Sequence, residues 1–286
     1  MGYSMKNKMI ILSIVAALLV AMLIWIIWGN TALELNIISV KDADLPKAFE
    51  GYKIAQVSDL HNDNANMGEK LIGLLKEAKP DIIVITGDMI DSGNPDVEGA
   101  LQFAKEAVKI APCYYVTGNH EAIVDETYAK LEQGLREAGV IVLRDEAVFL
   151  EKNGATIQLI GLDDLGFSPV NDQIEEATVM MGQTLIELVD EATYTVLLAH
   201  RPELIDIYVE STVDLVLCGH AHGGQFRIPF IGGVYAPGQG LFPKYDSGLY
   251  EVGETQMVVS RGIGNSIIPL RVNNRPEVVL VELQGE

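Results

Sequence analysis

The hydrophobic pattern of the chain begins with one long apolar segment. Residues 9–28, MIILSIVAALLVAMLIWIIW, contain no charged side chain and a single hydroxyl group, that of Ser13. A helix of this length, rising about 1.5 Å per residue, is roughly 30 Å long and matches the apolar core of a bilayer. We therefore predict a transmembrane helix at about residues 9–28.

Two other interpretations of this segment are a cleaved signal peptide and a buried helix. The apolar run is longer than the hydrophobic region of a usual signal peptide, and no A-x-A cleavage motif follows it in WGNTALE. We expect an uncleaved anchor and linker over residues 1–36, followed by one folded domain over residues 37–286. Trp25 and Trp28 would then lie at the level of the lipid headgroups.

After the anchor, short apolar runs alternate with segments of helical periodicity. The runs are rich in β-branched and aromatic residues, and the segments between them place apolar residues on one helical face. Such an alternation predicts an α/β fold. From about residue 224, Gly and Pro interrupt short strand-like segments, so we expect the last part of the chain to be mostly β. The predicted strands are 53–58, 81–87, 113–118, 156–161, 193–199 and 213–219, and the predicted helical faces are Leu71, Leu74, Leu75 and Ala78, and Val97, Leu101, Ala104 and Val108.

The composition adds a strongly acidic character to the predicted domain. All 40 acidic residues lie after the anchor, together with 18 of the 20 basic residues, which gives this part a formal net charge of −22. Such a surface repels polyanions and lacks the basic patch of a nucleic-acid-binding protein. We expect no nucleic-acid polymer as a partner, and we predict no protein partner. Cys113 and Cys218 lie in or beside predicted strands, which argues against a disulfide framework.

The orientation of the anchor is predicted from its flanks. Lys6 and Lys8 precede the span and Lys41 and Lys47 follow it, so the charge bias is slight. The short N-terminal tail is easier to leave behind than to translocate. We therefore expect a single-pass protein of the cell membrane whose folded domain is extracytoplasmic.

Residue types that bind metals stand at the carboxyl ends of the predicted strands. The first run ends in SDLH, the second in TGDMID, the third in TGNHE, the fifth in AHRPE and the sixth in GHAHGGQ. All five histidines of the chain lie in these segments, whereas histidines of a solvated surface would be scattered. Because open α/β sheets collect ligands at this edge, we expect the side chains to meet in one site. The candidate residues are Asp59, His61, Asp88, Asn119, His120, His200, His220 and His222.

The candidate site combines carboxylate, amide and imidazole groups, which are the ligands of Mn, Fe and Zn. In an extended backbone, residues i and i+2 point to the same side, so Asp59 with His61 can supply two ligands, and His220 with His222 two more. Seven candidate ligands, which exclude His120, are too many for one ion. The sequence therefore predicts a site for two divalent metal ions.

The ordered motifs at the strand ends resemble the signature of the calcineurin-like metallophosphoesterase superfamily. The pattern D-x-H, GD-x-x-D, GNHE, H and GH-x-H is complete and in order from Asp59 to His222. The tail SRGIGNSIIPLRVNNRPEVVLVEL and the anchor are similar to the membrane-associated bacterial branch, which includes UDP-2,3-diacylglucosamine hydrolase-like phosphoesterases. The resemblance covers about residues 50–285. It implies that residues 37–286 form a metallophosphoesterase domain with the metallo-dependent phosphatase fold, a four-layer α-β-β-α sandwich.

The resemblance also implies a role for each matching residue. His120 would lie near the scissile phosphate, either stabilising it or protonating the leaving oxygen. Asp91 and Glu121 match motif positions that more often support the loops. Outside the motifs, we expect Asp163 and Asp164 to be solvated loop residues, with contact to substrate as the alternative. One ion would be held by Asp59, His61 and His222, the other by Asn119, His200 and His220, with Asp88 bridging the two.

The implied activity is hydrolysis of phosphodiester or pyrophosphate bonds by a metal-bridging hydroxide. The substrate would be a phosphate ester, and the branch points to lipid-linked substrates such as UDP-diacylglucosamine. Three alternatives remain open: a phosphomonoesterase of small soluble substrates, a dinuclear hydrolase of carboxyl esters or amides, and a non-catalytic, membrane-tethered metal-binding scaffold. A scaffold would be free to lose ligands, and no ligand of the motifs is missing.

Overall fold

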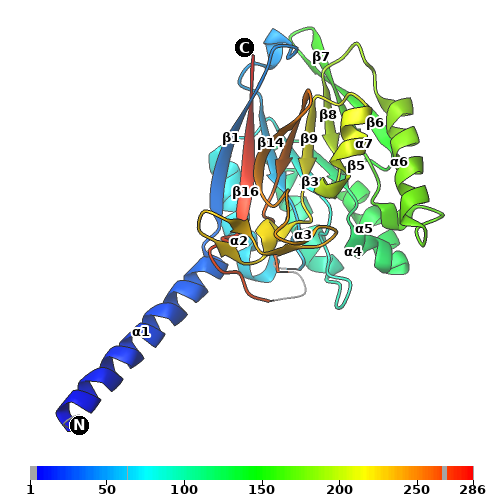
Figure 1. The fold of residues 1–286 in the computed structure, drawn as a ribbon. Helices are drawn as coiled ribbons and strands as arrows, with labels where there is room; N and C mark the ends of the chain where they lie inside the picture. The colour runs from blue at the N-terminus through cyan, green and yellow to red at the C-terminus, as the bar shows by residue number, and fades with distance from the viewer. Residues whose placement is uncertain (1–4, 63, 266–268, 286) are drawn as a thin grey trace.

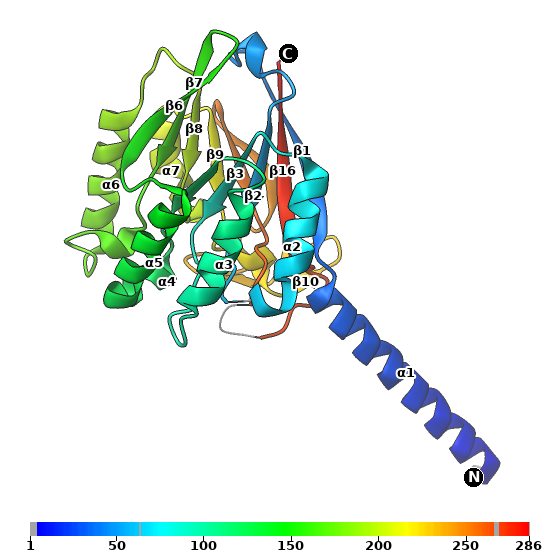
Figure 2. The same cartoon turned by 180° about the vertical axis from the view of Figure 1, so that it is seen from behind.

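The computed structural model describes residues 5–62, 64–265 and 269–285. Within these residues, two six-stranded sheets pack face to face, and helices cover the outer face of each sheet (Figures 1 and 2). The α-β-β-α sandwich expected for the metallo-dependent phosphatase fold is therefore confirmed. The helices are α1 (Met5–Thr31), α2 (Asn64–Ala78), α3 (Val97–Ala107), α4 (Asn119–Ile123), α5 (Asp125–Ala138), α6 (Ile174–Leu188) and α7 (Ile205–Glu210).

The first sheet has the strand order β1-β16-β2-β3-β4-β5, and the second has the order β14-β15-β9-β8-β7-β6. The strands of the first sheet are β1 (Glu34–Asp42), β2 (Lys53–Val57), β3 (Ile82–Thr86), β4 (Cys113–Val116), β5 (Ile141–Val142) and β16 (Glu277–Gly285). Those of the second are β6 (Glu146–Lys152), β7 (Ala155–Gly161), β8 (Thr195–Leu198), β9 (Leu215–Cys218), β14 (Gly248–Val252) and β15 (Thr255–Val259). Two small hairpins follow β9, namely β10 (Arg227–Ile228) with β11 (Gly232–Gly233), and β12 (Tyr235–Ala236) with β13 (Gly240–Leu241).

The central strands are buried on both faces, as the continuous apolar runs predicted. In β3, Ile82 and Val84 pack between the two sheets, while Ile83 and Ile85 pack under the helices on the outer face. This alternation follows from the two-residue period of a strand. Helices α2, α3 and α5 cover the first sheet, and α6 and α7 cover the second.

The strand directions place one edge of the first sheet next to the anchor. Strand β1, which begins shortly after α1 ends, runs parallel to β16, and β16 runs antiparallel to β2. Strands β3 and β4 run parallel to β2. The carboxyl ends of β2, β3 and β4 therefore lie at the end of the domain from which α1 leaves (Figure 1).

The structure differs from the sequence-based expectation around the anchor. Helix α1 extends beyond the predicted span at both ends, and β1 begins at Glu34, so that the linker expected up to residue 36 is only two residues long. Strand β1 is an edge strand with mostly half-exposed residues, which explains its weak apolar signal. The prediction of a mostly β segment after residue 224 is confirmed by β10 to β16, and Cys113 and Cys218 are buried and free.

Candidate metal centre

The predicted ligands meet at the carboxyl ends of five strands. Asp59 and His61 follow β2, Asp88 follows β3, Asn119 and His120 begin α4 after β4, His200 follows β8, and His220 and His222 follow β9. Three groups have donor atoms within 4.8 Å of one another: Asp59, His61 and His222; Asp88, His200 and His220; and His61, Asp88 and His120.

The first group surrounds one candidate ion position. The Nε2 atoms of His61 and His222 are 3.2 Å apart, and Nε2 of His222 is 3.4 Å from Oδ1 of Asp59. Oδ2 of Asp88 lies 3.6 Å from Nε2 of His61. All four side chains are almost completely buried. Four potential ligand atoms thus face a common point.

The second group surrounds a neighbouring position and shares the same carboxylate oxygen. Nε2 of His200 is 3.2 Å from Oδ2 of Asp88 and 3.2 Å from Nδ1 of His220. Asn119 directly follows Gly118, whose backbone lies against Asp88, and its Oδ1 is buried and accepts no hydrogen bond from the described residues. Oδ2 of Asp88 lies between the two groups, which is the position of a bridging ligand.

The protonation of His200 shows that this donor set fits a cation. Its Nδ1 lies 2.7 Å from the carbonyl oxygen of Thr86, which can only accept a hydrogen bond, so Nδ1 carries a proton. The neutral ring then has its lone pair on Nε2, directed at Asp88 and His220. Lone pairs that face each other at such distances repel unless a proton or a metal ion lies between them. Proteins commonly orient a metal-binding histidine through a hydrogen bond from the ring nitrogen that does not bind the metal, and the Nδ1–H of His200 makes such a bond to Thr86.

The ionisation of the site agrees with this interpretation. Burial alone would raise the pKa of Asp88, but His200 lowers it well below its ordinary value. Burial alone would lower the pKa of His200, but Asp88 raises it to about 10. In the metal-free protein, a proton between His200 and Asp88 therefore takes the place that a metal ion would occupy. Burial lowers the pKa of His61 to about 4, and also lowers the pKa values of His220 and His222. These three rings are therefore neutral at pH 7, which is the form that binds metals.

His120 has a different environment from the other histidines. Its Nδ1 accepts a hydrogen bond of 3.0 Å from the backbone N–H of Ser92, so the proton of the neutral ring is on Nε2. Its side chain is partly exposed, and its ring contacts that of His61 edge-on. His120 therefore presents a hydrogen-bond donor rather than a lone pair at Nε2.

The loops that carry the ligands have strained backbones. Five of the candidate ligands have a positive φ, which L-residues rarely adopt: Asp59 (52°), His61 (42°), Asp88 (52°), His220 (65°) and His222 (48°). Such strain persists where the surrounding structure holds it, and it clusters at functional sites. The glycines of the motifs are needed for close approach. A Cβ atom at Gly87 would lie 2.6 Å from Nδ1 of His200, and one at Gly118 would overlap the carboxylate of Asp88.

Glu121 holds two of these loops together, as the motif position implied. Its carboxylate is fully buried and accepts the backbone N–H groups of Asp88 at 2.9 Å, Gly118 at 2.8 Å and Ile90 at 3.2 Å. Asp91 lies further out, with Oδ2 3.8 Å from Nδ1 of His61. Both residues support the cluster from outside the ligand set.

The expectation that Asp163 and Asp164 are solvated loop residues is wrong. Asp163 pairs with Arg144, and Asp164 is buried and receives two hydrogen bonds, of 2.6 and 3.0 Å, from the guanidinium group of Arg201. Both acids face arginines that are remote in sequence, so the local pattern GLDDLGF carried no sign of the pairing. Arg201 directly follows His200, and its fixed position helps to hold this strand end.

Two residues near the cluster were missed by sequence reasoning. Oε1 of Glu203 lies 3.6 Å from Nε2 of His220, where it can orient this ring. The side-chain amide of Asn274 donates to the carbonyl oxygen of His222 at 2.6 Å. Glu203 lies in the strand-end segment AHRPE, so its position in the sequence could have indicated a place near the site. Asn274 lies far along the chain from the motifs, and no local pattern marks it.

Comparison with known proteins agrees with the fold and the cluster. The family described as calcineurin-like phosphoesterase matches residues 52–224. The uncharacterized metallophosphoesterase YkuE of Bacillus subtilis (strain 168) is 33% identical over 257 residues, covering 86% of this chain and 84% of YkuE. Phosphodiesterase YaeI of Escherichia coli (strain K12) is 30% identical over 238 residues, covering 81% of this chain and 82% of YaeI. The chain therefore belongs to the calcineurin-like phosphoesterases, a family of metal-dependent hydrolases of phosphoric esters that use a dinuclear metal centre.

A further relative bears on the anchor. The transmembrane protein with metallophosphoesterase domain of Danio rerio is 27% identical over 257 residues, covering 84% of this chain and 55% of that protein. Helix α1 is long and apolar enough to cross a membrane, and none of its described residues is buried. Together these findings indicate a single-pass membrane association.

Proposed function

We propose that this protein hydrolyses phosphodiester or pyrophosphate bonds of lipid-linked substrates, with its catalytic domain outside the cell membrane. The observation that carries the hydrolytic activity in this proposal is the shared position of Oδ2 of Asp88, 3.6 Å from Nε2 of His61 and 3.2 Å from Nε2 of His200. One carboxylate oxygen that faces both groups of candidate ligands fits a centre of two divalent ions.

The proposed ligand sets follow the two groups. When bound, Mn, Fe or Zn ions would neutralise the oxygens of the phosphoryl group and lower the pKa of water so that hydroxide is available near neutral pH. The residues of this chain would hold the ions, and their burial would exclude bulk water from the centre. One ion is assigned to Asp59, His61 and His222, the other to Asn119, His200 and His220, with Asp88 shared.

His120 is the proposed catalytic residue that contacts substrate. Because Nδ1 accepts the N–H of Ser92, the neutral ring has its only proton on Nε2. A ring in this state can donate a hydrogen bond from Nε2 to a phosphoryl oxygen. This hydrogen bond becomes stronger as negative charge develops on that oxygen in the transition state. To protonate the leaving oxygen fully, the ring would have to become doubly protonated beforehand, and Nδ1–H would then oppose the N–H of Ser92. The geometry therefore favours stabilisation of the phosphoryl group.

The position of the anchor supports a lipid-linked substrate. The carboxyl ends of β2, β3 and β4 lie at the end of the domain from which α1 leaves, and β1 starts shortly after α1. The candidate centre is therefore held close to the membrane surface. Tethering raises the local concentration of a substrate already held in the bilayer, and it gains little for a small soluble substrate.

The experiment compares kcat/KM for a lipid-linked pyrophosphate in vesicles with kcat/KM for its soluble headgroup analogue. We expect the protein with its anchor to prefer the lipid form, and the protein lacking residues 1–28 to lose most of that preference. Equal turnover of both substrates by both proteins would favour a phosphomonoesterase or phosphodiesterase of small soluble substrates. The absence of turnover with Mn, Fe and Zn would favour a metal-binding scaffold.

A further inference from the structure

The two hairpins after β9 expose apolar side chains at the end of the domain near the anchor. Phe230 is fully exposed, and Leu241, Ile231, Phe242 and Ile228 have exposed fractions of 71%, 64%, 59% and 41%. We call these five residues the apolar tip. They lie in β10, β13 and the adjoining turns, and Figure 2 shows β10 beside the base of α1.

Two phenylalanines of the apolar tip occupy strained turn positions. The φ angle is 69° at Phe230 and 54° at Phe242, a conformation that suits glycine or asparagine and is an outlier for a bulky side chain. An asparagine or glycine in these turns would be less strained and would not expose an aromatic ring. The surrounding turns hold both residues in this conformation, and the rings are left exposed.

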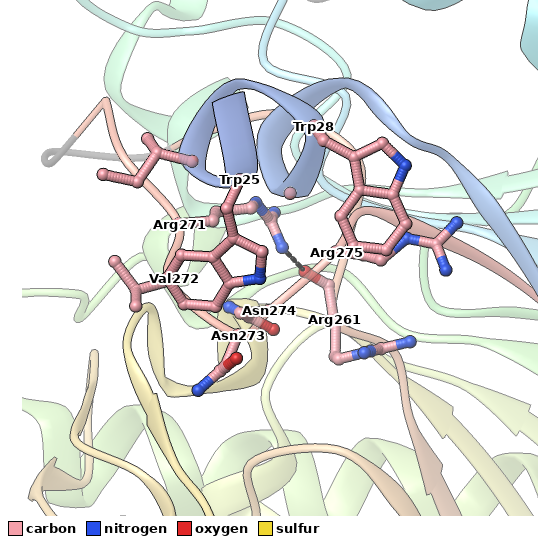
Figure 3. Close-up of a pocket in the computed structure, with 10 residues that line it drawn as sticks. Trp25, Trp28, Arg261, Arg271, Val272, Asn273, Asn274 and Arg275 are labelled. Atoms are coloured by element: carbon pink, nitrogen blue, oxygen red, sulfur yellow. Dashed lines mark hydrogen bonds between the residues drawn. The ribbon is translucent and has the colours of Figure 1, made fainter. Parts of the chain in front are cut away.

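The apolar tip is continuous with the base of the anchor through the segment 272–273. The N–H of Arg227 donates to the carbonyl oxygen of Val272 at 2.9 Å, and the side chain of Asn273 donates to the carbonyl oxygen of Arg227 at 3.3 Å. Asn273 lines a cavity of about 150 Å³ together with Trp25 (Figure 3), and it also lines a second cavity of about 640 Å³ together with Phe230.

The base of α1 is fixed on the domain rather than loosely tethered. Asn30 exchanges two hydrogen bonds with the backbone of Arg271, of 2.9 and 2.7 Å. The guanidinium group of Arg275 lies 4.7 Å from the ring centre of Trp28 and donates to the carbonyl oxygen of Ala32 (Figure 3). Helix α1 therefore leaves the domain in a fixed direction, from the same end that carries the apolar tip.

The charge distribution distinguishes this surface from the rest of the domain. No acidic residue occurs between positions 215 and 245, although the part of the chain after the anchor contains 40 acidic residues. Arg227 and Lys244 are the charged residues in this interval, and they flank the apolar tip. Asp246 lines the same hollow as Phe230, but its side chain is mostly buried and lies 3.2 Å from Nη1 of Arg227. An apolar surface whose acidic neighbour is buried and paired, with Lys244 beside it, is suited to the headgroup and acyl boundary of a bilayer.

We propose that the apolar tip inserts into the bilayer next to α1 and forms a second membrane contact of this protein. The bilayer is the favoured occupant because the apolar tip continues a surface that already ends at the transmembrane helix. The two contacts together would hold the candidate metal centre at a fixed height above the lipid, since β10 begins only a few residues after His222. This inference depends on the anchor and is independent of which phosphoester is hydrolysed.

The test uses the full-length protein in phospholipid vesicles, with a polarity-sensitive fluorophore on Phe230→Cys. Phe149→Cys is the matched control, because Phe149 is an exposed phenylalanine on the edge strand β6, away from α1. The native cysteines are buried and should not be labelled in the folded protein. We expect the label at position 230 to shift its emission to the blue and to be quenched by lipids with a quencher on the acyl chain. The label at position 149 should behave as in water.

The proposal is overturned if both labels report an aqueous environment in the vesicles. It is also overturned if the label at position 230 responds only at many copies per vesicle, because a second copy of the chain would then cover the apolar tip. A metal titration of the labelled protein provides a control for folding. Intact metal binding with an aqueous signal at position 230 counts against insertion rather than against the metal centre.

Discussion

The buried carboxylate of Glu121 offers a test of how the ligand loops are held. Glu121→Ala would leave the N–H groups of Asp88, Gly118 and Ile90 without their acceptor. Each unsatisfied buried N–H costs about 1–3 kcal/mol, so the sum is about 3–9 kcal/mol before any water enters the space. This is a large fraction of the roughly 5–15 kcal/mol by which domains are usually stable. The same substitution releases the loop that carries the shared ligand, so we also expect loss of both metal ions.

Glu121→Gln should have a smaller effect. Oε2 of Glu121 accepts two of the three hydrogen bonds, and the amide oxygen of glutamine can take this position. The amide NH₂ then faces the N–H of Ile90, and one hydrogen bond of 3.2 Å is lost. We expect a cost of about 1–3 kcal/mol.

The cost of Glu121→Gln should depend on pH in the metal-free protein. Burial, and then the charge of Asp88, raises the pKa of Glu121 from 4.5 to about 8. Because the folded-state pKa is raised, the stabilising contribution of protonated Glu121 is complete below pH 4.5 and is lost as the pH rises through 8. Glutamine does not titrate, so the penalty of the substitution should be largest below pH 4.5, should shrink as the pH rises from 4.5 to 8, and should be smallest and constant above pH 8.

The assay is thermal unfolding of the full-length protein in detergent, followed by circular dichroism, together with elemental analysis. A loss of 3 kcal/mol or more predicts a fall in Tm of about 6 °C or more for Glu121→Ala, since about 2–4 °C corresponds to 1 kcal/mol in domains of this size. Glu69→Ala, which removes an exposed glutamate on α2, is the control and should change stability by less than about 0.5 kcal/mol. Equal Tm and equal metal content for Glu121→Ala and this control would refute the reasoning.

Further predictions concern the metal centre and the anchor. Asp88→Ala should remove both ions, whereas His222→Ala should weaken mainly one, and elemental analysis that finds equal losses would contradict the assignment of a bridging ligand. His120→Asn should lower kcat by roughly 100-fold or more at near-normal metal content, and an unchanged kcat would exclude its role. Because an ion displaces the proton of His200, whose pKa is raised to about 10, metal affinity should increase about tenfold per pH unit near neutrality, and calorimetry in buffers of different ionisation enthalpy should detect the released proton. Removal of residues 1–28 should give a soluble, active domain. In spheroplasts, protease added outside should cleave the full-length domain, and cleavage only after lysis would reverse the proposed orientation.

The central strands and the clustering of the candidate ligands at their carboxyl ends could be predicted, because both rest on local signals. Strand β3 consists of buried apolar residues and is followed directly by Asp88, so one short segment indicates both a strand and its ligand. The edge strands β1 and β6 were not recognised, because half-exposed residues give no clear apolar run. The position of an edge strand depends on the strand with which it pairs. Strand β1 pairs with β16, at the other end of the chain, so the local sequence does not indicate this pairing.

The supporting residues could not be predicted, because their partners are distant in sequence. Arg201 pairs with Asp164 and Asn274 holds the backbone of His222, and neither contact follows from a local pattern. An arginine or an asparagine can bind many different partners, and which partner it binds depends on which side chains the tertiary structure brings next to it. The apolar tip was missed for a related reason. Its phenylalanines resemble core residues in a β segment, and their exposure follows from turn geometry that the hydrophobic pattern does not contain.

The most direct test of the account is a titration of metal-free protein with Mn²⁺, with hydrolysis of bis(4-nitrophenyl) phosphate measured at each addition. The shared position of Oδ2 of Asp88 predicts that activity is low with one ion per chain and becomes maximal at two ions per chain. Asp88→Ala, as the matched variant, should remain inactive over the whole titration. Full activity at one ion per chain, or metal-independent hydrolysis, would contradict the assignment of a dinuclear centre to this cluster.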